Sequence, residues 1–337
     1  MSKNMNHKLV VVGDIHLQSS EPKHSNTIDT LNFIFNDKNL NNPMNSVIFL
    51  GDLCEINSPF YCFEKFVDYF VNHSHFNQIY LLTGNHDVAN LDNVLALFRP
   101  LPKVKIITEW QIIDFYKCKI LALPYYNHES TDKQPMTEVY SNLYKNEELM
   151  NTEIDYCCGH VEDETQSFSK KYCDLSKLTN VKHFLHGHIH TCNIQNGGHY
   201  LGSACMNSVA ESGTPKYIAI IDGEDKSFEL KELPKFLEYY EVEYPNKLPK
   251  ITTKYGLFLV KNSLDKNTTL EEYSKQAEQL GFRFYARKIL NKKSKSIELD
   301  EIEKTEKLTF DDFAKSVKLG DAIADICREV IKLKGEE

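Results

Sequence analysis

The chain has 337 residues, of which 41% are hydrophobic, so it is long enough for one large domain and a smaller one. No apolar run approaches the roughly 20 residues that cross a bilayer, and residues 1–8 are polar, so we expect a cytoplasmic protein without a membrane segment or signal peptide. Nine cysteines without a Cys-x-x-Cys spacing argue against a disulfide framework and a thiolate zinc site, and the net charge of −9 argues against unaided nucleic-acid binding.

Strand-like and helix-like segments alternate over the first part of the chain, which is typical of β-α-β units. We predict strands at residues 9–12, 47–50 and 79–82, and helices at residues 25–35, 59–71 and 91–98. Next come short strands within 105–123, a helix at 137–150, a strand at 154–158 and several strands within 181–233. This order predicts an α/β fold in which two sheets pack face to face with helices outside.

The last third of the chain reads as separate units. Strands at 237–242, 251–260 and 282–289 with a helix at 270–280 predict a small α+β domain over residues 236–290, after a first domain of residues 1–235. Residues 291–308 are mostly charged and polar and are expected to form a linker. Residues 309–337 have the spacing of an amphipathic helix, which either folds back on its own domain or docks on a partner. The linker before it favours docking.

Five short segments carry potential metal ligands in a fixed order, each after a predicted strand. Taken singly, Asp14 and Asp52 would be turn residues or helix caps. Their occurrence with histidines and an asparagine at successive strand ends instead favours a metal site, because such ends converge at one edge of a sheet. The five segments are Gly13-Asp14-Ile15-His16, Gly51-Asp52, Gly84-Asn85-His86-Asp87, Gly159-His160 and Gly187-His188-Ile189-His190.

Seven candidate ligands are too many for one ion but suit two ions that share a bridging carboxylate. One ion would take Asp14, His16 and His190, the other would take Asn85, His160 and His188, and Asp52 would lie between them. This mixture of oxygen and nitrogen donors suits two Mn²⁺ ions, with Mg²⁺, Fe²⁺ or Zn²⁺ as alternatives. Two ions about 3.5 to 4 Å apart can hold a bridging hydroxide in line with a phosphoester leaving group, which predicts phosphoester hydrolysis.

His86 follows the candidate ligand Asn85 directly and is predicted to act beside the ions as the catalytic residue, protonating the leaving oxygen or holding the phosphate. Asp87 is predicted to orient His86 or to cap the helix that begins near residue 91. We expect His186 to be a strand-end residue, and the neighbouring Cys157 and Cys158 to pack as small hydrophobic side chains.

The five segments in this order resemble the motifs of the calcineurin-like metallophosphoesterases. Within that family, Gly51-Asp52-Leu53-Cys54 and the stretch from Tyr200 through Glu211 to Lys216 are similar to the SbcD-type DNA repair nucleases, in particular phage-encoded ones. The resemblance implies a four-layer α/β/β/α sandwich with a small α+β capping domain and a C-terminal helix. Many relatives carry a histidine three residues after the bridging aspartate, where this chain has Glu55.

The resemblance further implies the dimetal nuclease subunit of an SbcCD-type recombination and repair complex, in the bacterial or phage-host cytoplasm. It would act as a 3′–5′ double-strand exonuclease and single-strand endonuclease on DNA. An SbcC-type, SMC-like ATPase would bind the C-terminal helix, and two nuclease subunits would form a homodimer within a heterotetramer. The bound ions and the ATPase would offset the net negative charge. Two alternatives stay open: a phosphodiesterase or phosphatase for small nucleotides, and a non-catalytic scaffold.

Overall fold

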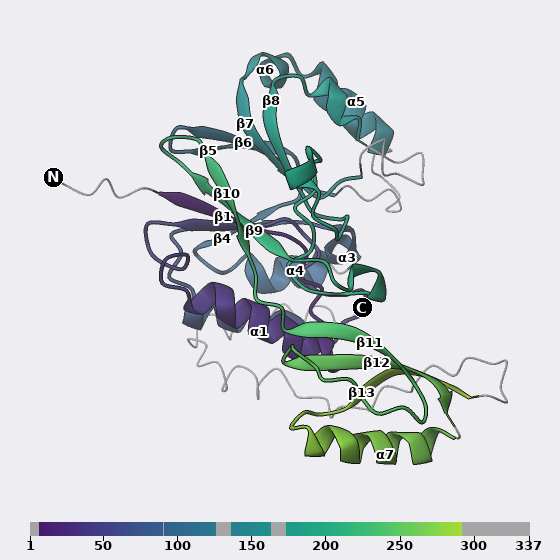
Figure 1. Cartoon of the computed structure of the whole chain (residues 1–337). Coiled ribbons are helices and arrows are strands. Elements are labelled where there is room, and N and C mark those ends of the chain that lie inside the picture. The colour runs from purple at the N-terminus through teal and green to yellow at the C-terminus, as the bar shows by residue number, and fades with distance from the viewer. Residues whose placement is uncertain (1–6, 90, 126–135, 163–172, 264, 292–337) are drawn as a thin grey trace, which may run out of the picture.

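Two β-sheets packed face to face form the centre of the computed structural model (Figure 1). The structure describes residues 7–89, 91–125, 136–162, 173–263 and 265–291. The first sheet has the strand order β10-β9-β1-β2-β3-β4, with β1 to β4 mutually parallel and β9 and β10 antiparallel to their neighbours. Its strands are β1 Lys8–Val12, β2 Ser46–Phe49, β3 Ile79–Leu82, β4 Val104–Ile107, β9 Tyr217–Asp222 and β10 Phe228–Glu232.

The second sheet has the order β5-β6-β7-β8, in which β6, β7 and β8 are parallel. Side chains from the facing sides of the two sheets form one buried core, with Val11 and Ile48 from the first sheet beside Ile120 and Tyr156 from the second. Because β1 and β2 are also covered on their other face, their side chains are buried on both sides and read as continuous apolar runs. The strands are β5 Gln111–Phe115, β6 Cys118–Leu123, β7 Ile154–Gly159 and β8 Val181–His186.

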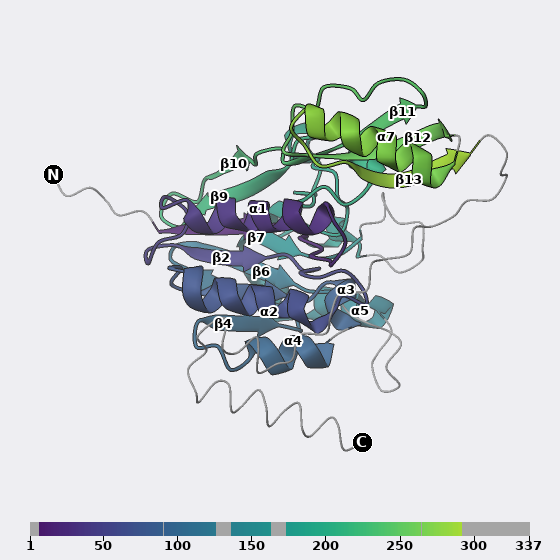
Figure 2. The ribbon, with the colours of Figure 1, turned by 90° about the horizontal axis from the view of Figure 1, so that it is seen from below.

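Helices cover both outer faces of this pair of sheets. The helices α1 (Lys23–Asn36), α2 (Phe60–Asp68) and α4 (Leu91–Phe98) supply buried side chains to the core on the outer face of the first sheet, and they lie side by side in Figure 2. The helices α5 (Met136–Lys145) and α6 (Glu147–Asn151) cover the second sheet. The predicted four-layer α/β/β/α sandwich is therefore confirmed.

Two local predictions were wrong in this sandwich. The single helix expected at 137–150 is two helices, because the Asn146 side chain accepts a hydrogen bond from the Leu149 N–H and caps a new helix there. The strands expected between turns within 181–233 are only partly present, because β8, β9 and β10 form but residues 187–216 form loops and two short 3-10 helices, η3 (Ile194–Asn196) and η4 (Val209–Glu211). A further 3-10 turn, η2 (Leu175–Lys177), precedes β8, and a π-helical turn, η1 (Tyr69–His73), extends α2.

A third sheet of three parallel strands follows, in the order β11-β12-β13. The helix α7 (Lys266–Gln279), capped by Asp265, packs on one face of this sheet around Phe258 and Tyr273. The opposite face meets the sandwich, where Leu237, Tyr239 and Leu257 pack with Met206. The strands are β11 Leu237–Glu243, β12 Tyr255–Ser263 and β13 Tyr285–Asn291.

The expected linker at 291–308 and terminal helix at 309–337 lie outside the described residues and stay predictions. Within the described part of the chain, no helix combines the length and apolar character that a bilayer crossing requires. The site is positioned by the parallel strands, since β1, β2 and β3 in one sheet and β7 and β8 in the other direct their carboxyl ends toward one region.

Candidate metal centre

Each predicted ligand segment directly follows a strand. Asp14 and His16 come after β1, Asp52 after β2 and Asn85 after β3, at the first residue of the short helix α3 (Asn85–Val88). The remaining three follow β7 and β8 of the second sheet, and these are His160, His188 and His190. The two sheets thus bring all seven predicted ligands to one place.

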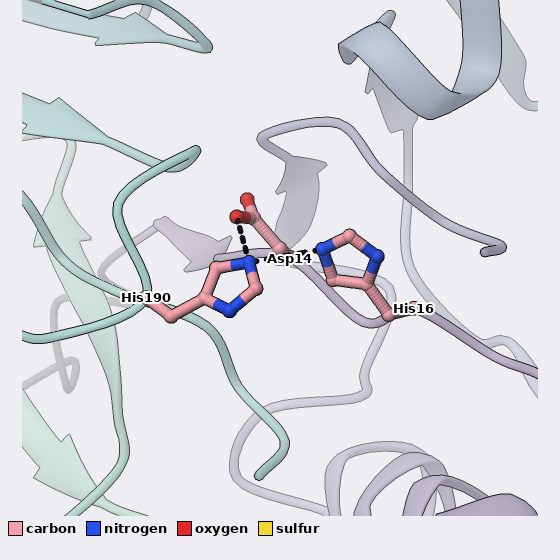
Figure 3. Close-up of side chains that lie close together, drawn as sticks. All are labelled: Asp14, His16 and His190. Carbon is pink, nitrogen blue, oxygen red and sulfur yellow. Dashed lines mark hydrogen bonds and ion pairs between the residues drawn. The ribbon is translucent and has the colours of Figure 1, made fainter. Parts of the chain in front are cut away.

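The first cluster consists of Asp14, His16 and His190 (Figure 3). The Nε2 atoms of His16 and His190 are 3.0 Å apart, and the same nitrogen of His190 is 3.6 Å from Asp14 Oδ2. The other oxygen of that carboxylate, Oδ1, is buried and has no hydrogen-bond partner among the residues that the structure describes. His160 Nδ1 is 3.5 Å from this oxygen but donates to the Leu50 carbonyl, so a bound cation would compensate the buried oxygen.

The second cluster consists of Asp52, His160 and His188, joined by Asn85. Asn85 Oδ1 is 3.0 Å from both His160 Nε2 and His188 Nδ1, and those two nitrogens are 3.2 Å apart. Asp52 lies between the clusters, because its Oδ2 is 3.3 Å from His160 Nε2 and 3.5 Å from His16 Nε2. This is the place predicted for a bridging carboxylate.

Three histidines have their outer ring nitrogen fixed by an acceptor. His160 Nδ1 donates to the Leu50 carbonyl at 2.9 Å, His188 Nε2 donates to Glu162 at 3.0 Å, and His190 Nδ1 donates to Glu211 at 3.0 Å. In a neutral ring the remaining nitrogen then carries a lone pair, and in each case that nitrogen is the one directed into the cluster. Metal-binding histidines have this arrangement.

The backbone is strained at three of the seven positions. His16 has a φ of 50°, Asp52 a φ of 49° and His188 a φ of 74°, all in the left-handed region that residues with a Cβ atom rarely adopt. Each such residue costs about 1 to 3 kcal/mol and persists only where the surroundings hold it, most often at functional sites. That three predicted ligands share this strain supports a role for them beyond folding.

The electrostatics of the cluster favour a bound cation. Burial raises the pKa of the Asp52 carboxyl, but the His160 and His16 rings outweigh this effect and hold that pKa below its usual range. Burial lowers the pKa of His160, but the negative charges of Asp52 and Asp14 outweigh it and raise this pKa to about 9. At His160 the carboxylates thus draw positive charge to the inward-facing nitrogen, whereas burial lowers the pKa of His16 and of His188. Carboxylate, amide and imidazole donors without a thiolate fit Mn²⁺, Fe²⁺ or Zn²⁺, so the residues fit two such ions.

His86 lies at the edge of the centre, where a carboxylate holds it. Its Nδ1 donates to Glu55 Oε1 at 2.7 Å, and its Nε2 lies 3.9 Å from Asp52 Oδ2. Burial disfavours the charged ring, but the hydrogen bond to Glu55 and the charge of Asp52 together raise the pKa of His86. Burial also raises the pKa of Glu55, but its contacts with His86 and His16 lower that pKa to about 2. Glu55 therefore stays ionised and orients His86.

We expect the Glu55→Gln substitution to slow phosphodiester hydrolysis by about tenfold or more, because the neutral amide no longer stabilises a protonated His86. Bound metal should be unchanged, since Glu55 Oε2 is 3.6 Å from His16 Nδ1, which is too far for a hydrogen bond to that ring. Steady-state kinetics on a chromogenic phosphodiester, with metal content measured in parallel, checks this. An unchanged rate would show that Glu55 does not act through His86.

The other residues singled out in the sequence have structural positions. Asp87 caps α3 rather than the helix near residue 91, because its carboxylate accepts from the N–H groups of Gly84 at 2.9 Å and Leu53 at 3.0 Å. His186 ends β8 and is fully buried, as expected. Cys157 and Cys158 are also fully buried, and burial raises the pKa of the Cys158 thiol to about 12, so neither is positioned to act as a thiolate ligand.

Two glycines of the motifs are required by close approach. A Cβ atom on Gly84 would lie 2.1 Å from Asp52 Oδ1, and one on Gly187 would lie 2.1 Å from Asp14 Oδ1. Both distances are far below any tolerable contact. The glycine before a ligand segment therefore leaves room for the carboxylate of another segment.

We expect Gly187→Ala to abolish stabilisation by Mn²⁺, because the new methyl group must displace the Asp14 carboxylate. Thermal unfolding with and without Mn²⁺ measures this. Gly197→Ala is the matched control, because Gly197 has a φ of 78° and a methyl group added there would have no heavy atom of the described residues within 4 Å beyond its own chain neighbours. The control should lower stability through backbone strain and keep the response to Mn²⁺. A normal metal response in Gly187→Ala would contradict the prediction.

Four residues around the ligands were not predicted as part of the site. Glu55, Glu162 and Glu211 each hold a histidine, and Lys216 contacts Glu211. Glu55 and Glu162 follow ligands by three and two residues, and this short spacing is the only local signal in the sequence. Glu211 and Lys216 were named only as part of the stretch that is similar to the SbcD-type nucleases, and no role was predicted for them.

Comparison with known proteins identifies the family. Residues 7–192 match the family described as calcineurin-like phosphoesterase. A solved structure of a novel archaeal phosphodiesterase is 15% identical and covers 67% of this chain and 99% of its own, with a TM-score of 0.36. A protein of unknown function from Aquifex aeolicus is 19% identical and covers 51% of this chain and 85% of its own, with a TM-score of 0.30. No curated protein matches the chain. On the family match, the chain belongs to the calcineurin-like phosphoesterases, a family of metal-dependent phosphoesterases.

Proposed function

We propose that the chain is a DNA nuclease of the SbcD type that hydrolyses phosphodiesters with two divalent ions, Mn²⁺ being favoured. The observation that carries this proposal is the position of the metal centre, which reaches the protein surface beside the extra α+β unit of β11, β12, β13 and α7. A polymer needs such an accessible site, whereas a small nucleotide can be enclosed.

The centre is buried at its base and accessible at its rim. Asp14 and His160 are fully buried, while the side chains of His188, His190 and His86 are 18%, 27% and 17% exposed. Ile56, whose N–H donates to Glu55, is 44% exposed beside this rim. The rim residues can therefore meet a phosphodiester that is part of a large substrate.

The extra unit packs against the segment that supports the centre. Tyr239 of β11 contacts Met206 and Val209 in the core between the two units, and Val209 begins η4, which ends at Glu211. The guanidinium of Arg287, on β13, lies 5.9 Å from the centre of the Tyr239 ring, and Arg287 is exposed. The unit that packs against the segment carrying Glu211 thus presents an exposed cation, which suits the flanking phosphates of a nucleic acid.

In the proposed reaction, each group of the centre has a separate role. When bound, two divalent ions polarise the phosphoryl oxygen and activate the attacking water. Asp52 and the two clusters fix where the scissile phosphate is held. His86 carries a proton on Nε2, on the side facing Asp52, and donates it to the departing 3′-oxygen, while Glu55 stabilises the charged ring.

The test uses the purified chain with Mn²⁺, end-labelled linear duplex DNA and bis-p-nitrophenyl phosphate, with and without a chelator. Chelator-sensitive degradation of the DNA is expected, and His86→Gln should remove it, which excludes a contaminating nuclease. Hydrolysis of the small diester with the DNA left intact would instead favour a phosphodiesterase for small nucleotides. If neither substrate is hydrolysed, with or without Mn²⁺, the result would favour a non-catalytic scaffold.

On the resemblance alone, we also propose that an SbcC-type ATPase binds residues 309–337 and that the nuclease subunits form a homodimer within a heterotetramer. Deletion of residues 309–337 should then abolish capture of the ATPase and leave hydrolysis of bis-p-nitrophenyl phosphate unchanged. Retention of ATPase binding by the deletion variant would overturn the assignment of this segment.

A further inference from the structure

A buried charge pair lies behind the metal centre, outside the residues that match the family. Glu211, at the end of η4, and Lys216, directly before β9, have side chains only 3% and 10% exposed. Their charged groups are 2.6 Å apart. A buried pair of this kind is costly to desolvate and is weak evidence for stability, so its position suggests another purpose.

Both members of the pair contact His190. Glu211 Oε1 accepts a hydrogen bond from His190 Nδ1 at 3.0 Å, and Lys216 Nζ donates to the His190 carbonyl at 3.0 Å. Lys216 also donates to Ser203 Oγ at 2.8 Å, so with Glu211 its ammonium group has an acceptor for each of its three protons. The pair therefore fixes the ring and the backbone of the same residue.

The carboxylate is held on both of its oxygens. Besides His190, Glu211 Oε1 accepts from Ser208 Oγ at 2.9 Å, while Oε2 accepts from Lys216 and from the Asn207 N–H at 3.3 Å. With donors on both of its oxygens and the Lys216 ammonium group 2.6 Å away, the carboxylate is a fixed acceptor that selects the tautomer of His190 with its proton on Nδ1.

We propose that Glu211 and Lys216 are positioning residues that hold His190 for the ion of the Asp14, His16 and His190 cluster. The pair directs His190 Nε2 toward Asp14 and His16 and leaves that nitrogen unprotonated. Replacing such an outer partner of a metal-binding histidine typically weakens metal binding by about 10- to 100-fold. Substitution of Glu211 or Lys216 should weaken binding of this ion only. The other cluster uses His188, which Glu162 holds instead.

Glu162 offers a matched comparison. Its distance to His188 Nε2, 3.0 Å, equals the Glu211 contact, but its side chain is 27% exposed. Water can replace an exposed partner more readily than a buried one, so Glu162→Gln should weaken binding less than Glu211→Gln. The two substitutions should also affect different ions.

The experiment measures Mn²⁺ binding to the full chain by calorimetry, in two backgrounds that each weaken one cluster. In His188→Ala, which keeps the first cluster intact, Glu211→Gln should weaken Mn²⁺ binding about 10- to 100-fold. In His190→Ala, the same substitution should have almost no effect, because its target is gone. Glu162→Gln should show the reverse pattern. Equal effects of Glu211→Gln in both backgrounds, or no effect in either, would overturn the proposal.

Lys216→Met alone leaves Glu211 buried without its counter-charge and can prevent folding. The double variant Glu211→Gln/Lys216→Met removes both charges and should fold, while its Mn²⁺ affinity stays as low as that of Glu211→Gln. Lys216→Arg should recover part of the affinity. The proposal rests on the metal centre described above, but its readout is bound Mn²⁺, so the nuclease proposal can fail while this one stands. Absence of saturable Mn²⁺ binding by the unaltered chain would overturn both.

Discussion

His86→Gln is expected to leave both ions bound and to slow DNA hydrolysis by a factor on the order of 10² to 10⁴, the usual contribution of a general acid. The substitution removes a ring whose Nε2 is 3.9 Å from Asp52 Oδ2 and replaces it with an amide, whose N–H groups can donate a hydrogen bond but are far too weakly acidic to protonate the leaving oxygen. The His86 N–H, which donates to Asp52 Oδ1 at 2.8 Å, belongs to the backbone and is kept. The position of the carboxylate, and with it metal binding, should therefore survive.

Two measurements decide this prediction. Calorimetric titration with Mn²⁺ should give the same stoichiometry for His86→Gln as for the unaltered chain, while single-turnover hydrolysis should be slower. His183→Gln is the matched control, because His183 is exposed on β8 and stacks on Tyr156 away from the centre. Full activity of His86→Gln would refute the role of His86, and loss of metal together with activity would make it a structural residue.

The sandwich and its ligand segments could be predicted because their signals are local. An apolar run followed within three residues by glycine and a polar ligand marks the ends of β1, β2 and β3, glycine followed by histidine marks the ends of β7 and β8, and the parallel topology brings these ends together. Helices α1, α2 and α4 were predicted to within a few residues from their own periodicity. In these segments the structure is determined by residues close in sequence, so the spacing of apolar and polar residues is sufficient to predict it.

Apart from the local helix cap at Asn146, the errors arose where distant residues determine the structure. The strand predicted to begin at residue 251 begins at Tyr255, because β12 starts where it pairs with Leu237 of β11. Residues 187–216 show no periodicity, yet their loops place Glu211 and Lys216 on His190, across 21 and 26 residues of sequence. Contacts of this kind depend on the completed fold.

Glu55 shows the same limit at short range. Its spacing of three residues from Asp52 is visible in the sequence, but no local pattern there indicates its partner. Its partner, His86, lies on a different strand end, and only the packing of β2 beside β3 brings the two within 2.7 Å. Glu55 therefore determines how His86 is held, through a contact that depends on the completed sheet.

Asp52→Asn is expected to remove the response of the chain to Mn²⁺ and to reduce hydrolysis by about 10³-fold or more, since several kcal/mol of transition-state stabilisation depend on the ions. Asp52 faces both clusters through a single oxygen, with Oδ2 3.5 Å from His16 Nε2 and 3.3 Å from His160 Nε2. In the asparagine variant, Oδ1 can still accept from the His86 N–H, which places the amide N–H₂ where the ions need an anionic oxygen.

Thermal or chemical unfolding with increasing Mn²⁺ measures this effect directly. At a free Mn²⁺ concentration 100 times its Kd, each ion should stabilise the unaltered chain by about 2.7 kcal/mol, and Asp52→Asn should gain almost nothing. Asp155→Asn is the matched control, because Asp155 is also buried but binds Lys182 and Lys226 at distances of 3.2 and 2.9 Å. That variant should be less stable at every Mn²⁺ concentration and keep the full metal response. If Asp52→Asn kept the response as well, the carboxylate would not bridge the ions, and the two clusters would have to bind metal independently.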